Sequence, residues 1–260
     1  MPRHLLPVGP ATTPAQRGNG TAARQGGAPA SAPAPAPVRV PAAAEPIPFA
    51  GLTLVHAAVR RDLARIPQAL RLLQPDDAET AEALKRHWDF VTAMVTCHHE
   101  QQDTRLWPVL RRFAPELRLL LNWLESDHHN LDQCFTRTTT LVGIATRDPA
   151  SAWSVSYAVE ELAARVETHL RIEERQLLPR MAGVFPPGSR IGTLPELLDL
   201  LRFADGPSAS DALVWLLEGV DPARVDRLLA DCDDETARHW PHWRDTYARC
   251  TDRLWGPPGQ

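Results

Sequence analysis

Cysteine is scarce in this chain, and long apolar runs are missing. The four cysteines among 260 residues show no CxxC spacing, which excludes a disulfide framework of the small secreted type and predicts thiols in a reducing compartment. No apolar stretch reaches the roughly 18 residues that a membrane-spanning helix needs. Prolines interrupt the first residues where a signal peptide would need an apolar core. We therefore expect a cytoplasmic protein that has no membrane partner.

The sequence also lacks a basic run, strand patterns and familiar catalytic motifs. The net charge is -4, which argues against nucleic acid as the main partner. Runs of alternating β-branched residues, which would predict strands, are absent, so we expect an all-α fold. No pattern resembles a nucleophile with its base or a phosphate-binding loop, and catalytic residues are therefore not assigned.

The two ends of the chain differ from its middle. Residues 1–50 hold eleven of the 25 prolines, many in Ala-Pro alternation, and have no hydrophobic period. This composition predicts a disordered arm. Residues 186–260 carry four of the eight tryptophans, with breaks at 205–207 and 219–222. They predict a helical C-terminal extension of three or four shorter helices that packs on the rest of the chain.

Residues 51–185 have the periodicity of four long helices. Apolar residues recur at three- and four-residue spacing, and short breaks fall near positions 75, 115 and 148. Four helices joined by short turns predict an up-down-up-down four-helix bundle. We expect Asp76 and Glu79 to cap the second helix, and Pro67 to kink or shorten the first.

Histidine and glutamate recur on these four predicted helices at positions that favour a shared site. They are His56 on the first helix, His98 and His99 on the second, His128 on the third, and His169 with Glu173 on the fourth. At a rise of about 1.5 Å per residue, His98, His128 and His169 fall roughly 20 Å from the same end of the bundle. Imidazole and carboxylate groups that converge from facing helices are how a bundle core binds a dinuclear metal.

An internal repeat supports this interpretation. Residues 98–108 read HHEQQDTRLWP, and residues 169–179 read HLRIEERQLLP. Aligned on Leu-x-Pro, His98 matches His169, Gln102 matches Glu173, and Asp103 matches Glu174. Because residues four apart share a helix face, His169 and Glu173 can reach the same metal pair. One half of the bundle thus repeats the other, as a two-metal site requires.

These motifs resemble the hemerythrin-like HHE cation-binding domains over about residues 50–185. The matching pieces are His56 with the following RRDL, the histidine pair and LWP of the second helix, the Asp-His of the third, and His169-x-x-x-Glu173 with LLP of the fourth. The resemblance implies a four-helix bundle with two non-haem iron ions, another divalent metal being the alternative. Its members bind oxygen, sense oxygen or iron, or act in redox and nitrosative stress responses. Carried over by position, the ligands are His56, His98, His128, His169 and Glu173.

The second helix departs from the family pattern, and two registers remain open. The position that usually carries a bridging glutamate is Gln102, whose neutral amide cannot bridge two cations as a carboxylate does. His99, Glu100 and Asp103 form an alternative set, about 100° around the helix, in which Asp103 is a candidate ligand. The sequence does not choose between the His98 and His99 registers. On the third helix, His128 with Asp132 similarly competes with His129 and Gln133.

Three functions follow from these residues. The first is a di-iron protein that binds or senses oxygen or a related small reactive gas, since histidine-rich ligation stabilises high-valent iron less. The second is an oxidative di-iron enzyme, if Glu100, Asp103 or Asp132 makes the site oxygen-rich. The third is a metal-free degenerate bundle that serves as an interaction module. The residues name neither a substrate nor a protein partner, and they do not decide whether the protein is an enzyme.

Overall fold

The computed structural model describes residues 49–186, 188–202 and 208–256. Every regular element in these ranges is a helix, and the prediction of an all-α fold is confirmed. The predicted arm of residues 1–50 lies outside the described residues, except for its last two positions. No helix within the described ranges is long and apolar enough to cross a membrane.

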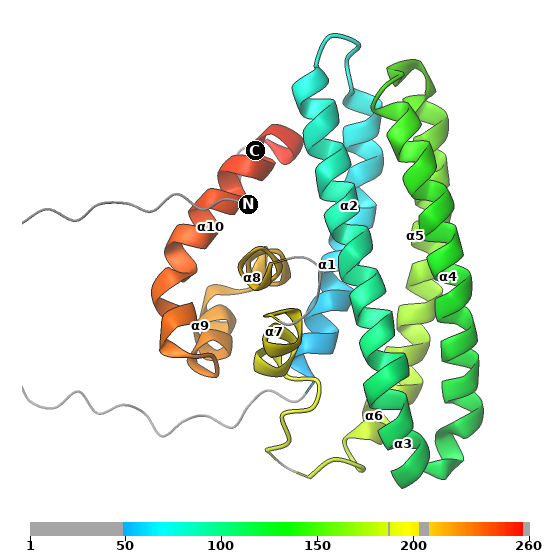
Figure 1. Cartoon of the computed structure of the whole chain (residues 1–260), viewed down its shortest axis with the longest axis vertical. Coiled ribbons are helices and arrows are strands. Elements are labelled where there is room, and N and C mark those ends of the chain that lie inside the picture. Colours follow the sequence, from blue (N-terminus) through cyan, green and yellow to red (C-terminus); the bar gives the residue numbers. More distant parts are fainter. Residues whose placement is uncertain (1–48, 187, 203–207, 257–260) are drawn as a thin grey trace, which may run out of the picture. The chain divides into compact units, whose positions relative to one another are not determined.

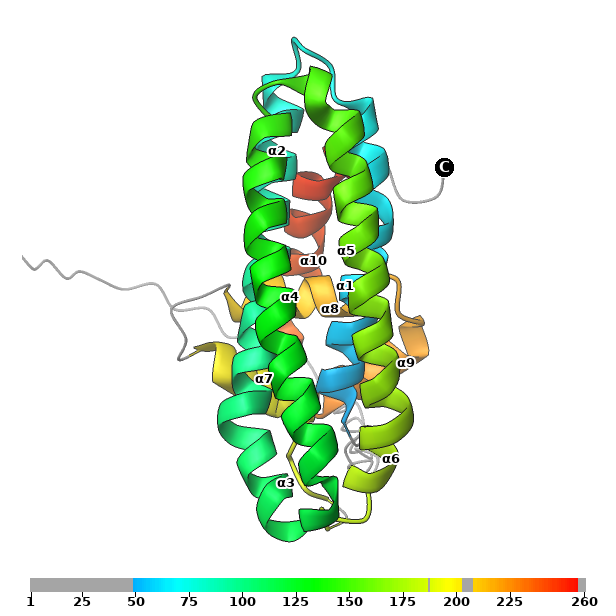
Figure 2. The same cartoon turned by 90° about the vertical axis from the view of Figure 1, so that its right-hand side faces the viewer.

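Four long helical segments lie side by side, and successive connections lie at opposite ends (Figures 1 and 2). The first segment contacts the second and the fourth, and the third contacts the same two. The segments are, in order, α1 (Ala50–Leu72); α2 (Ala78–Gln101) with η1 (Gln102–Leu106) and α3 (Trp107–Phe113); α4 (Arg118–Ala145); and α5 (Ala152–Ile172) with η4 (Glu173–Leu177) and α6 (Leu178–Met181). Short 3₁₀ turns, η2 (Pro115–Leu117) and η3 (Pro149–Ser151), precede α4 and α5.

Local residues explain where these helices begin. The Asp77 carboxylate accepts a hydrogen bond from the backbone nitrogen of Thr80 at 3.0 Å and caps α2, so the cap lies one residue after the predicted Asp76. Asp148 accepts a hydrogen bond from the backbone nitrogen of Ala150 and in the same way caps η3, the turn that precedes α5. Helix α1 runs past Pro67 to Leu72, so the proline does not end the helix.

Two of the long segments contain a π-helical turn at matching positions. Residues 102–106 and 173–177 are each five residues of π-helix inside an otherwise α-helical segment. Such turns insert a residue into the helix and occur frequently at functional sites. They begin at Gln102 and Glu173, which the internal repeat aligns with each other. The hydrophobic period alone predicted uninterrupted helices here and missed both turns.

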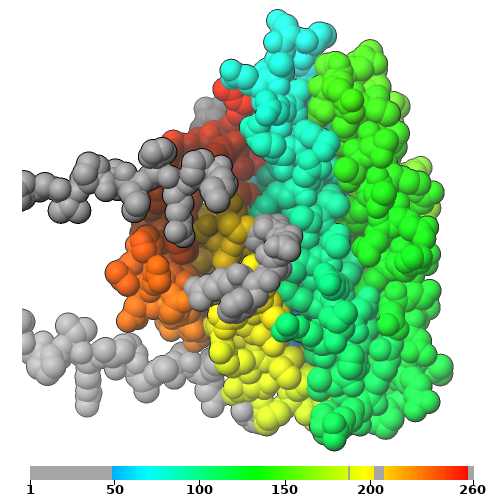
Figure 3. Space-filling model, viewed as in Figure 1, coloured from blue at the N-terminus to red at the C-terminus, as the bar shows by residue number. Residues whose placement is uncertain are grey.

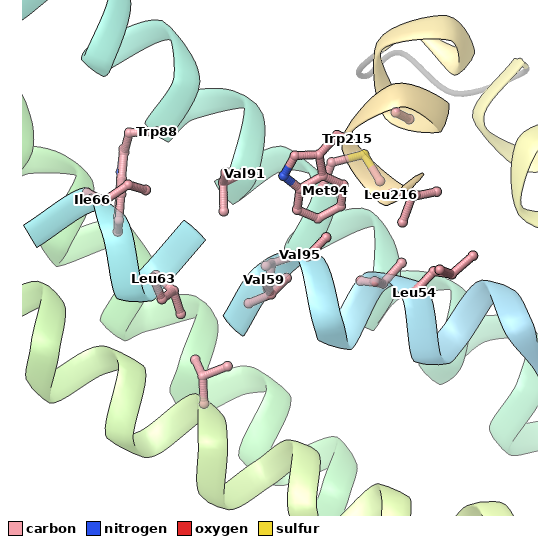
Figure 4. Close-up of a cluster of buried hydrophobic side chains, with 14 of the residues drawn as sticks. Leu54, Val59, Leu63, Ile66, Trp88, Val91, Met94, Val95, Trp215 and Leu216 are labelled. Atoms are coloured by element: carbon pink, nitrogen blue, oxygen red, sulfur yellow. The ribbon is translucent and has the colours of Figure 1, made fainter. Parts of the chain in front are cut away.

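The apolar side chains form two clusters. The larger one joins α1, α2, α4 and α5 with the C-terminal helices, and Figure 4 shows Val59, Leu63, Val91 and Met94 among its members. The smaller cluster lies around η1, α3, the start of α4 and the end of the fourth segment. Along α2 and α4, His98, His99 and His128 lie between members of the larger cluster and members of the smaller one, and on α5 His169 lies beside Leu170, the last member of the larger cluster on that helix. A polar layer therefore crosses the long helices where the two apolar clusters meet.

The C-terminal residues form four helices, α7 (Leu194–Arg202), α8 (Ala209–Leu217), α9 (Pro222–Ala230) and α10 (Asp234–Trp255). Ser208, Asp221 and Asp233 cap α8, α9 and α10. Helix α8 contacts α1, and α10 contacts both α1 and α2. Trp215 of α8 is fully buried and belongs to the larger cluster (Figure 4). The extension therefore shares the core of the long helices.

A buried carboxylate on α1 ties the extension to the long helices. Asp62 accepts hydrogen bonds from His87 Nε2 and from Trp215 Nε1, both at 2.7 Å, and Arg65 pairs with it at 2.7 Å. Burial alone would raise the pKa of Asp62, but His87 and the neighbouring arginines outweigh it and lower the pKa to about 2. The ionised carboxylate thus links α1, α2 and α8 in one network.

Candidate metal centre

Six titratable side chains fill the polar layer. They are His56 from α1, His98 and His99 from the end of α2, His128 from α4, His169 from α5, and Glu173, the first residue of η4. Each of them is at most 5% exposed. Burial of so many polar groups is costly unless they are paired or coordinate a metal.

The six side chains fall into two groups of three. His56, His98 and Glu173 form one, and His99, His128 and His169 form the other; within each group the potential ligand atoms lie within 4.8 Å of one another. Consecutive residues of a helix point about 100° apart, so the neighbouring His98 and His99 can serve different groups. The two registers of the second helix are therefore not alternatives, because the structure places one histidine in each group.

Glu173 belongs to the first group and also faces the second. Its Oε2 is 3.0 Å from His56 Nε2, while its Oε1 is 3.5 Å from His169 Nε2 and 3.7 Å from His128 Nε2. Burial would raise the pKa of Glu173, but the three nearby imidazoles of His128, His169 and His56 outweigh it and hold the pKa well below its usual range. The carboxylate is thus an anion whose two oxygens face different histidine groups.

In four of the five histidines, a carboxylate lies within hydrogen-bonding distance of Nδ1, the outer nitrogen of the ring. The Nδ1 atoms lie 2.8 to 3.0 Å from a carboxylate oxygen in the pairs His56–Glu174, His99–Asp132, His128–Asp103 and His169–Asp127. A carboxylate that accepts from Nδ1–H fixes the tautomer and leaves Nε2 as the basic nitrogen. This is how metal-binding histidines are commonly oriented. Asp103, a candidate ligand from the sequence, lies beside a histidine and outside both groups.

A bound metal would explain the surroundings of Nε2, the inner ring nitrogen of these histidines. Nε2 of His56, His98, His128 and His169 is buried, and none of them has a hydrogen-bond partner. His56 Nε2 is close to Glu173 but lacks hydrogen-bonding geometry. An unsatisfied buried polar atom costs about 1–3 kcal/mol, so four in one layer are difficult to explain as packing alone. The donor set fits one or two metal ions.

Without a metal, the histidines differ in charge. Burial lowers the pKa of His98 well below its usual value, and the neighbouring His56 adds to the effect. Burial also lowers the pKa of His99. At His128, Asp103 and Glu173 outweigh burial and raise the pKa to about 9. Because only a neutral imidazole binds metal, an ion entering the layer displaces a proton from His128.

Gln102 takes a role that the sequence did not indicate. The side chain is buried, and its Nε2 donates to both oxygens of Glu173, at 3.0 and 3.2 Å. The amide nitrogen must face Glu173, because an ionised carboxylate only accepts hydrogen bonds. Gln102 Oε1 points elsewhere and has no partner. Gln102 therefore positions the carboxylate that lies between the two groups.

Sequence reasoning missed Glu174 and Asp127 and interpreted Asp132 as a possible ligand. Glu174 accepts a hydrogen bond from His56 at 3.0 Å and another from Arg60 at 2.6 Å. These two partners lower the pKa of Glu174 to about 2. One signal was available, since the internal repeat aligns Asp103 with Glu174, and both contact the Nδ1 atom of a histidine on another helix. No spacing rule links Asp127 to His169, because they lie on different helices.

Comparison with known proteins agrees with this geometry. The family model of the hemerythrin HHE cation binding domain matches residues 48–182, which is more than half of the chain. No curated protein and no solved structure matches. The matched range contains both groups of three and all four outer carboxylates, and it ends before α7. The chain therefore belongs to the hemerythrin HHE cation-binding domain family.

Proposed function

We propose that the polar layer is a dinuclear non-haem iron centre. His56, His98 and Glu173 would hold one ion, His99, His128 and His169 the other, and Glu173 would bridge them through its two oxygens. The observation that carries this proposal is the set of four buried Nε2 atoms without a partner, together with a carboxylate that faces both groups. Imidazole and carboxylate ligands also suit zinc, copper and nickel, and another divalent metal is the alternative occupant.

The ligand set favours binding or sensing of oxygen or a related small reactive molecule. A pair of iron ions, when bound, supplies reversible redox chemistry towards such molecules. The protein contributes five imidazoles and one carboxylate, and this low count of anionic ligands favours reversible binding over formation of high-valent iron. We propose a role in redox or nitrosative stress responses, as the resemblance to the hemerythrin-like family implies.

The surrounding residues would orient the ligands. The outer carboxylates hold four imidazoles with Nε2 inwards, and Gln102 holds Glu173. We further propose that residues 51–185 form the family's up-down-up-down four-helix bundle and that residues 186–260 are a helical extension of it.

An oxidative di-iron enzyme is the second candidate. An oxygen-rich ligand set is not supported, because Asp103 and Asp132 contact the Nδ1 atoms of histidines and Glu100 is exposed. What favours an enzyme instead is a cavity beside His98. The metal-free interaction module offers no explanation for the four unpartnered nitrogens.

Metal content tests the proposal directly. Iron, zinc and manganese per chain are measured by elemental analysis after aerobic purification from iron-supplemented cells, and we expect about two irons. His98→Ala and His99→Ala should each lose about one of the two, because the two residues belong to different groups. His129→Ala is the matched control, since His129 is exposed and adjacent to His128. A wild-type protein without metal overturns the proposal.

Oxygen binding is tested on the iron-loaded protein. Alternating exposure to oxygen and to oxygen-free buffer should change the visible absorption reversibly over several cycles. Irreversible change, with continued oxygen consumption in the presence of a reductant, would instead favour the oxidative enzyme.

A further inference from the structure

A cavity of about 350 Å³ lies beside the polar layer. His98 and Gln102 line it, together with apolar side chains from three parts of the chain. These side chains are Leu52 and Val55 of α1, Leu106 and Val109 of η1 and α3, and Ile191, Leu197 and Leu200 near and within α7. Figure 3 shows the α7 region (yellow) against the long helices. The C-terminal extension, which lies beyond the family match, thus supplies one wall.

Close backbone contacts hold this wall in place. The backbone nitrogen of Gly51 donates to the Gly192 carbonyl oxygen at 2.8 Å. A Cβ atom on Gly51 would lie 2.8 Å from the carbonyl oxygen of Thr193, so only glycine allows this approach. Gly192 has a φ of 72°, and its backbone nitrogen donates to Glu196 Oε2 at 2.6 Å. The segment ahead of α7 is therefore fixed against the start of α1.

Where the cavity meets the polar layer, one of its lining residues has an unused hydrogen-bond acceptor. Gln102 is 2% exposed, and its Oε1 has no partner because the amide nitrogen is held by Glu173. His98, also buried, lines the same space. An unsatisfied buried carbonyl oxygen is costly, and a donor on a bound molecule would remove that cost. Gln101, Arg105 and Glu196 also line the cavity.

The size of the cavity indicates an organic molecule. An engineered apolar cavity of about 150 Å³ holds benzene, and cavities of about 300–1,000 Å³ enclose small organic ligands. At about 350 Å³, the space is far larger than a diatomic gas requires. Its mainly apolar lining favours a mainly apolar occupant, because polar groups that lack a partner are expensive to bury.

We propose that this cavity binds an apolar organic molecule with one hydrogen-bond donor, such as a phenol, whose donor bonds to Gln102 Oε1 beside His98. The inference rests on the proposed metal centre, because it names the substrate class of the oxidative enzyme. Binding itself needs only the cavity and the amide oxygen. The C-terminal extension is then part of the binding site.

Two fluorescent probes test the proposal on the full chain, metal-free and iron-loaded. 2-Naphthol carries the donor, and naphthalene is the matched probe without it. We expect 2-naphthol to bind about 2- to 10-fold more tightly, as one additional hydrogen bond allows. Gln102→Met should abolish this preference while naphthalene still binds. Absence of 2-naphthol binding to the wild type, or an unchanged preference in the variant, overturns the proposal.

Cavity-filling variants test where the probe binds. Leu200→Trp and Val109→Trp project indole rings from opposite walls, and each should weaken 2-naphthol binding about 10-fold or more because the space is filled. Leu119→Trp is the control, since Leu119 is 83% exposed on α4. Circular dichroism identifies any variant that fails to fold. If one of the two cavity variants fails to fold, the affinity of the other one decides the test. Wild-type affinity in a folded cavity variant, or an equal loss in the control, places the probe elsewhere and overturns the proposal.

Iron content measured on the same samples separates the two proposals. Two irons per chain without 2-naphthol binding would overturn the cavity proposal alone. Binding of 2-naphthol by a wild-type chain that takes up no iron would overturn the metal centre and leave the cavity site standing.

Discussion

The two histidine groups of the polar layer differ in how firmly their rings are held. In the group of His99, His128 and His169, which we term the enclosed group, every ring has an aspartate on Nδ1. In the group of His56, His98 and Glu173, the open group, only His56 has such a carboxylate. Within the described part of the chain, no carboxylate accepts from His98, which instead lines the cavity beside α7.

The two groups contain similar ligands that are held with different firmness. A carboxylate on Nδ1 fixes the ring and strengthens the nitrogen that faces the metal. In the proposed centre, the enclosed group would therefore hold its ion more firmly than the open group. The open group has a less constrained ligand and a space next to it, so it is where a small molecule would reach an ion. The predictions below test this difference.

Removing Glu173 should have the largest effect, because it is the residue that faces both groups. We expect Glu173→Gln to lose most of both metal ions per chain, as measured by elemental analysis. Glu161→Gln, an exposed position on α5, is the matched control and should keep both. Retention of two metals by Glu173→Gln would show that the carboxylate does not join the groups.

Removing an outer carboxylate of the enclosed group should weaken metal binding by that group alone. Asp103→Asn leaves the size of the side chain unchanged but replaces the charged partner of His128. Loss of such a partner costs about 10- to 100-fold in metal affinity, which competition with a chelator measures. The prediction requires one ion to be weakened and the other unchanged; equal weakening of both ions would contradict the division into two groups.

The charge of His128 should make the metal-free protein sensitive to alkaline pH. Its pKa is raised from 6.5 to about 9, so its stabilisation is complete below pH 6.5 and is lost as the pH rises through 9. We expect the free energy of unfolding of the metal-free protein to fall by on the order of 2 kcal/mol over this interval. Iron-loaded protein should lack this loss, since the bound imidazole is already neutral. Chemical denaturation at several pH values measures both forms, and equal slopes would refute the prediction.

Replacing Gln102 with glutamate should have the smallest effect, and its sign should depend on metal. In the metal-free protein a second carboxylate would lie beside Glu173, and the repulsion should lower the melting temperature. With metal present, the added anionic oxygen should raise occupancy of the open group by a few-fold. Thermal unfolding with and without iron measures the two effects. A variant destabilised equally in both states would show that residue 102 does not face the ions.

Much of the fold could be predicted from hydrophobic spacing. The apolar period and the breaks at Pro and Asp located the four long segments to within a few residues. The exact helix ends were not predicted, because they depend on local caps such as Asp77. The π-helical turns at Gln102 and Glu173 were not predictable in this way. An inserted residue leaves the apolar positions on both sides in place and changes only the register between them.

The common depth of His98, His128 and His169 was also predictable, because helices of similar length bring residues at equal depth together. The assignment of both His98 and His99 was not, since a helical period places them on different faces without saying what each face meets. The outer carboxylates were missed for a related reason. Asp127 and His169 lie 42 residues apart in sequence, and their contact depends on how α4 packs against α5.

The amino-acid sequence by itself determined that this protein is helical, that His98, His128 and His169 share one depth, and that it resembles a cation-binding family. These properties depend on short-range periodicity, which the chain carries locally. Only the tertiary structure decided that the histidines form two groups, that Gln102 positions Glu173, and that the C-terminal extension makes one wall of a cavity. Those properties depend on which faces of separate helices meet, and long-range packing determines that arrangement.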